Sequence, residues 1–148
     1  MAKIALRVKF GRDTRMNDHH MNEQELQTLV ADYLSIQYPN VIFHSDFGSG
    51  VKLTPWQAIL QKRQNGGRRA WPDLFIAEPA GMRCGLFIEL KRYGTRLKKR
   101  NGGWASSHIA EQAVMLDDLI EKGYSARFAV GFDEAKEIID NYLKRAKL

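Results

Sequence analysis

The sequence lacks the features that define several large protein classes. It has one cysteine, so no intramolecular disulfide can form, which suits a reducing cytoplasm. No apolar run approaches the roughly 20 residues that cross a bilayer, and the first residues contain no signal-peptide core. There is no GxxxxGK phosphate loop, and the four scattered histidines give no usual zinc-ligand spacing. We therefore expect a cytoplasmic chain with no membrane span, no nucleotide cofactor and no structural zinc.

Positive charge is the main excess in the composition. The 148 residues include 23 Lys and Arg against 17 Asp and Glu, a formal net charge of +6. The cations are concentrated in short clusters, at residues 62–63, 68–69, 91–92, 96–100 and 144–147. Such a surface favours a polyanion such as nucleic acid, because binding releases counterions. A basic surface that only keeps the protein in solution is the alternative that composition leaves open.

Residues 71–91 carry the most informative pattern, and we predict a β-hairpin there. Asp73 opens an apolar run, turn residues follow, and the chain returns through LFIELK, which contains Glu89 and Lys91. Because strand side chains alternate between faces, Glu89 and Lys91 share one face while their apolar neighbours point toward a core. This acid and base, facing an Asp from the adjacent strand, can hold a divalent cation. The alternative is an ion network between two strands with no catalytic role.

A predicted helix before the hairpin brings Glu23 toward it. Asn22 is placed to cap this helix, with Glu25 completing a capping box. At about 100° per residue, Glu23 lies beside the apolar stripe of the helix, so it can border the core and face a site. An acid in the first turn is also explained by the helix dipole alone.

A second predicted helix follows the hairpin and ends at Gly123. Ser106 or Ser107 can cap it. Gln112 lies next to the apolar stripe and can project beside the strand that carries the lysine. His108 precedes it by four residues on the same face and is a candidate phosphate contact.

The order of these residues resembles the PD-(D/E)xK nuclease superfamily. The motif strings are Pro72-Asp73 and Glu89-Leu90-Lys91, and the helices with Glu23 and Gln112 lie on either side. The arrangement is similar to the VRR-NUC type, which is related to Holliday junction resolvases and whose small stand-alone members are common in phages and prophages. The resemblance covers residues 22–130. It implies an α/β, restriction-endonuclease-like fold with an αβββαβ core on a mixed sheet.

The resemblance also implies a metal-dependent site, with the catalytic side chains Asp73, Glu89, Lys91, Glu23 and Gln112. Asp73, Glu89 and the backbone carbonyl of Leu90 would bind Mg²⁺, with Mn²⁺ as a substitute, and Glu23 would bind directly or through water. Hard oxygen ligands suit these cations, which keep several waters and accept phosphate oxygens. Lys91 would orient or help to deprotonate the attacking water. Gln112 would position Lys91, water or phosphate.

Two basic segments could grip DNA near this site. The loop at residues 92–100 has five cations in nine positions, and we expect a mobile DNA-gripping flap, although a solvated loop has the same composition. A long insertion at residues 46–70 combines cations with a helix expected at residues 55–64. Its Trp56 either packs a small core of the insertion, which we expect, or stacks on DNA. The DNA-binding side chains we expect are Arg68, Arg69, Arg92, Arg96, Lys98, Lys99, Arg100 and His108.

We expect a single domain spanning residues 1–148, with the insertion inside the family core and one addition at each end. Residues 2–10 alternate between apolar and polar, which predicts an extra strand, either at a sheet edge or paired with another subunit. Residues 1–21 form this extension, and residues 131–148 should form a terminal helix capped by Asp133. Cys84 is expected to be a small strand residue.

The function these patterns predict is that of a Mg²⁺-dependent DNA endonuclease. Branched DNA such as a four-way junction is the substrate that the resemblance implies, and a junction resolvase needs two active sites and therefore a homodimer. A flap or nicking nuclease of phage DNA processing is an alternative. A non-catalytic DNA-binding module of the same fold is another, although the joint presence of the three hairpin residues argues against it.

Overall fold

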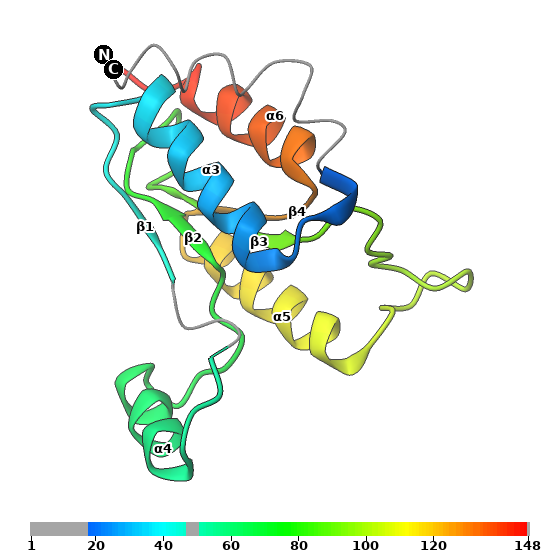
Figure 1. Ribbon diagram of the computed structural model, residues 1–148. Coiled ribbons are helices and arrows are strands. Elements are labelled where there is room, and N and C mark those ends of the chain that lie inside the picture. The colour runs from blue at the N-terminus through cyan, green and yellow to red at the C-terminus, as the bar shows by residue number, and fades with distance from the viewer. Residues whose placement is uncertain (1–17, 47–50, 148) are drawn as a thin grey trace.

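A four-stranded mixed sheet forms the centre of the computed structural model, which describes residues 18–46 and 51–147 (Figure 1). Its strands follow in the order β1 (Phe43–Ser45), β2 (Leu74–Ile76), β3 (Leu86–Lys91) and β4 (Ser125–Val130). β2 is antiparallel to both of its neighbours, β1 and β3, and β4 runs parallel to β3. A parallel neighbour requires a crossover connection, and the helix between β3 and β4 provides it.

Helices cover both faces of the sheet (Figure 1). The helices α3 (Glu23–Gln37) and α6 (Phe132–Leu143) pack on one face, and α5 (Ser107–Glu121) packs on the other. The alternation predicted for β3 is confirmed, because Ile88 and Leu90 lie in the core below α3 and α6, while Phe87 packs with Leu116 of α5. Every residue of β3 is buried, so polar side chains on it are held inside the protein.

The predicted fold class is confirmed, and so are several predicted element ends. Asn22 and Glu25 form the capping box of α3, and Ser106 caps α5. The helix α4 (Pro55–Gln64) spans the residues predicted for it. In chain order the elements of the core read αβββαβ, with α4 inserted between β1 and β2. The strand predicted at residues 2–10 lies outside the described residues.

The start of α6 differs from the prediction, because Asp133 does not cap it. The helix begins at Phe132 after Gly131, whose φ of 81° is in the left-handed region, and the cap position contributes no side-chain hydrogen bond. Asp18 replaces the local cap, since its carboxylate accepts from the Phe132 backbone N–H at 3.1 and 3.3 Å. A Cβ at position 131 would lie 2.9 Å from the Asp18 carboxylate, so a glycine is needed there.

Two further predictions are wrong, one for a residue placed in a strand and one for a residue placed in a small core. Cys84 lies in the turn before β3 and is exposed. Trp56 is 64% exposed and packs no core in the insertion. The helix that carries it projects away from the sheet (Figure 1), and none of its described residues is buried.

Within the described part of the chain, no helix combines the length and apolar character needed to span a membrane.

Candidate active site

The three hairpin residues of the predicted motif lie together on the floor of a cleft. Asp73 immediately precedes β2, and the antiparallel pairing of β2 with β3 brings it beside the far end of β3, where Glu89 and Lys91 lie. The exposed fractions are 8% for Asp73, 3% for Glu89 and 6% for Lys91. Charged side chains are seldom buried to this extent unless they pair with each other or bind a ligand.

Hydrogen bonds fix the orientation of this group. The Lys91 Nζ atom lies 3.0 Å from Glu89 Oε1. The backbone N–H of Leu90 donates to Asp73 Oδ2 at 2.9 Å. The N–H and C=O of a strand residue point to the same side, so the Leu90 carbonyl also points toward Asp73, beyond the last β2–β3 pair, Leu74 with Ile88. The Asp73 carboxylate and the Leu90 carbonyl are therefore close together, and Glu89 is near enough to Asp73 to be affected by its charge.

Opposing effects act on the pKa of Glu89 in this cluster. Burial raises the pKa of Glu89 to about 8, and the nearby Asp73 carboxylate acts in the same direction. The Lys91 ammonium opposes this rise through its charge and its hydrogen bond. Two carboxylates and one ammonium are thus buried together, and a divalent cation placed between the carboxylates would favour the ionised form of both.

The two helix residues of the motif also reach the cluster. Gln112 of α5 is buried, and its Nε2 donates to Glu89 Oε1. The direct contact of Gln112 is therefore with the acid of the motif. The Gln112 Oε1 atom is buried and has no hydrogen-bond partner among the described residues. Glu23 lies at the rim, 54% exposed, with its carboxylate 4.0 Å from Lys91 Nζ.

The walls of the cleft carry positive charge. The cavity measures about 830 Å³, and α4 and the segment after it form one side, contributing Lys62, Arg68 and Arg69. His108 of α5 also lines it. Arg68 is held by Asp118 of α5, with 2.8 Å between the paired atoms. The structure thus brings three of the predicted DNA-binding residues to the cleft.

The remaining predicted DNA contacts lie on the loop after β3. Arg92 lines a smaller neighbouring pocket with His19 and His20, while Arg96 and the cations at residues 98–100 are exposed and do not line the cleft. The loop folds back on itself, because Lys98 forms a bridge with Trp104 and its Nζ lies 3.3 Å from the centre of the indole ring. Lys98 is therefore engaged within the protein.

Sequence reasoning did not identify Gln27, which organises the base of the site. It lies one turn after Glu23 on α3 and is 9% exposed. Its Nε2 donates to Ser45 Oγ at 2.8 Å and lies 3.3 Å from the Asp73 carbonyl oxygen, so it ties β1 to the start of β2. Asp46, whose N–H donates to the same carbonyl at 2.8 Å, brings another acid to the cleft lining. A polar residue within the apolar stripe of α3 was the available signal.

The donors present fit Mg²⁺ or Mn²⁺. Among the described residues, no group of three or more His, Cys, Asp and Glu side chains could hold a metal ion by itself. Mg²⁺ does not require such a group, because it is usually bound through one or two carboxylates and keeps several waters. Asp73, Glu89 and the Leu90 carbonyl supply that number of ligands, and the unpartnered Gln112 Oε1 can accept a hydrogen bond from a water of the ion.

A comparison with solved structures supports the same fold. The chain is similar to a structure described as a "VRR_NUC domain protein", with a TM-score of 0.57 and 24% sequence identity. The similarity covers 84% of this chain and 90% of that one. No protein-family model matches the sequence, and no curated protein matches it. The restriction-endonuclease-like fold predicted from the sequence is therefore confirmed by the structure and its neighbour.

Proposed function

We propose that the protein is a metal-dependent endodeoxyribonuclease that hydrolyses phosphodiester bonds. The observation that carries this proposal is the buried cluster of Asp73, Glu89 and Lys91 at the floor of a cation-lined cleft. A structural ion network would need neither the cleft nor the excess of acid over base within it. The likeness to the VRR_NUC domain protein supports the same function.

Each residue of the cluster has its own expected role in phosphodiester hydrolysis. Asp73, Glu89 and the Leu90 carbonyl would hold Mg²⁺, which supplies charge stabilisation to the phosphoryl oxygens and makes bound water more acidic. Lys91 Nζ lies 3.0 Å from Glu89 and 4.0 Å from Glu23, and we expect it to hydrogen-bond the attacking water and to stabilise the charge that develops. Gln112 keeps Glu89 in its orientation.

The cleft wall would position the DNA. Lys62, Arg69 and His108 line the same cavity as the catalytic cluster, and side chains of this kind bind phosphate oxygens without reading the base sequence. The exposed cations of the loop after β3 extend the positive surface beyond the cleft. We expect affinity to depend strongly on salt concentration, because each phosphate contact releases counterions.

Branched DNA is the substrate that we propose within this class. The support is the resemblance of the motif order to small phage-type nucleases related to junction resolvases, together with the shared fold. The test compares matched linear, flap, splayed and four-way DNA in Mg²⁺, Mn²⁺ and chelator. Symmetric paired cuts at the four-way junction are expected. Cutting confined to flaps or linear DNA would keep the nuclease and remove the junction preference.

A non-catalytic DNA-binding module is the second candidate, favoured by the basic cleft wall alone. It predicts binding of the same DNA substrates with no cleavage in either metal. The buried acids distinguish the two proposals, since a binding module gains nothing from carboxylates that repel phosphate.

A further inference from the structure

The insertion forms an arm whose helix is not buried against its own protein. The arm, defined as residues 51–70, contains α4, which begins with a Thr54–Gln57 capping box and Pro55 in its first turn. A helix of ten residues is marginal in water without packing on one face. No described residue of α4 is buried, and Trp56 and Ile59 are 64% and 52% exposed. The arm therefore presents apolar surface that a partner would cover.

Ile59 lines the cleft together with Lys62, whereas the part of the apolar surface formed by Trp56 and Leu60 lies on a different side of α4. At about 100° per residue, Trp56 and Leu60 lie about 120° and 160° around the helix axis from Lys62, which lines the cleft. Arg63 lies only about 20° around the helix axis from Trp56, so a cation lies beside the apolar residues Trp56 and Leu60. One side of α4 can therefore remain on the active site while another side is docked elsewhere.

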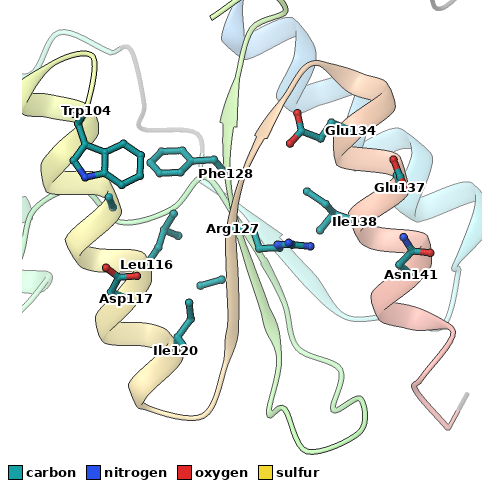
Figure 2. Close-up of a pocket in the computed structure, with 12 residues that line it drawn as sticks. Trp104, Leu116, Asp117, Ile120, Arg127, Phe128, Glu134, Glu137, Ile138 and Asn141 are labelled. Atoms are coloured by element: carbon teal, nitrogen blue, oxygen red, sulfur yellow. The ribbon is translucent and has the colours of Figure 1, made fainter. Parts of the chain in front are cut away.

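A groove of matching character lies between α5 and α6, as Figure 2 shows. It measures about 430 Å³ and runs over β4, the end strand of the described sheet. Its apolar lining includes Leu116, Ile120, Phe128 and Ile138. Carboxylates line both sides, with Asp117 on α5 and Glu134 and Glu137 on α6.

The charges of the arm and the groove are complementary. Residues 51–70 contain five cations and no acid. Three acids and a single cation, Arg127, line the groove. A DNA backbone would be repelled by this groove, whereas a cationic helix with an apolar stripe fits it as helices commonly fit grooves.

We propose that the arm of one copy of this chain docks in the α5–α6 groove of a second copy, so that two arms are exchanged in a homodimer. In its own chain the base of the arm is held away from the groove, because Arg68 pairs with Asp118 of α5, which lies about 100° around the helix from Asp117 of the groove. A reciprocal exchange makes both contacts identical, as two-fold symmetry requires. The proposal does not depend on the nuclease activity.

Docking would also affect the active site. The helix α4 carries the docking side, with Trp56 and Leu60, and also Lys62, which lines the cleft. A partner bound to the docking side would therefore hold this wall of the cleft in place. The isolated copy would retain its buried catalytic cluster and lose the support of the arm.

Charge exchange tests the contact directly. Arg63→Glu changes the docking side of the arm, and Glu137→Lys changes the groove; neither residue belongs to the proposed catalytic or DNA-binding set. We expect the wild type to sediment at twice its 17.0 kDa. Each variant alone should dimerise at least roughly tenfold more weakly. An equimolar mixture should recover the dimer, because both arm–groove contacts then join opposite charges.

Matched controls distinguish this contact from a general effect of surface charge on association. Glu111→Lys reverses an exposed charge on α5 outside the groove and should leave the mass unchanged, and circular dichroism should show that each variant is folded. Trp56→Ser should also weaken the dimer. A monomeric wild type, or a dimer that all these changes leave intact, overturns the proposal. An unchanged mass with weaker DNA binding in Trp56→Ser would instead make the arm a DNA contact.

Discussion

Glu89 should make the stability of the metal-free protein depend on pH. Its pKa is raised from 4.5 to about 8, mainly by burial and further by Asp73. The folded protein therefore holds this proton more tightly than the unfolded chain does. Between these two pH values the free energy of unfolding falls as pH rises. The stabilisation that comes from protonated Glu89 is therefore complete below pH 4.5 and is lost as the pH rises through about 8.

The size of the effect follows from the same two values. One pH unit is equivalent to about 1.4 kcal/mol for a group that is protonated in the folded state and ionised in the unfolded state. Between pH 5 and pH 8, Glu89 should therefore remove roughly 3 kcal/mol from the free energy of unfolding. This is a large share of the stability of an ordinary domain. Glu89→Gln keeps an oxygen acceptor for Gln112 and cannot ionise, so most of the slope should disappear.

Urea unfolding in a chelator at several pH values between 5 and 8 measures this slope. Wild type and Glu89→Gln are compared with Glu111→Gln, in which an exposed acid of α5 is changed. We expect Glu111→Gln to follow the wild type and Glu89→Gln to be much flatter. Equal slopes in all three proteins would show that Glu89 is ionised at neutral pH without a cation, which would refute the electrostatics described for the site.

Three further predictions concern the site and its surroundings. Mg²⁺ at pH 8 should raise the Tm of the wild type and leave that of Asp73→Asn nearly unchanged, because the variant loses a charged ligand; equal shifts would place the ion elsewhere. Charge reversal at residues 98–100 should weaken DNA binding and reduce the dependence of affinity on salt, as measured by titration at several salt concentrations. Gln27→Ala should lower the free energy of unfolding by about 1–3 kcal/mol and slow cleavage, since it frees the backbone that carries Asp73; unfolding and single-turnover rates measure the two effects.

The hairpin with Asp73, Glu89 and Lys91 could be predicted because the sequence signals for it are local. Strand alternation alone places Glu89 and Lys91 on one face, and a short turn brings Asp73 alongside them. The helix caps are local as well, since Asn22 and Glu25 are three residues apart. Such features depend on backbone geometry over a few residues, and the structure reproduces them.

The features that could not be predicted from the sequence depend on contacts between distant parts of the chain. Asp18 caps α6 from a position 114 residues before Phe132, and no local pattern specifies that pairing. Trp56 is exposed because no other element of the described chain packs on its side of α4. The spacing of apolar residues along α4 would be the same if it were packed, so the sequence could not distinguish the two arrangements. Gln27 becomes informative only when Ser45 and Asp73 are placed beside it. Tertiary packing decides each of these outcomes.

Single-turnover cleavage of end-labelled DNA by wild type and Lys91→Ala is the decisive experiment for the proposed nuclease site. Four-way and linear DNA are incubated with Mg²⁺ or with chelator, and binding of the same DNA is measured in parallel. We expect cleavage by the wild type in Mg²⁺ only, and loss of cleavage with nearly unchanged binding in Lys91→Ala. Equal cleavage by both proteins, or cleavage in chelator, would contradict a metal-dependent site built on Asp73, Glu89 and Lys91.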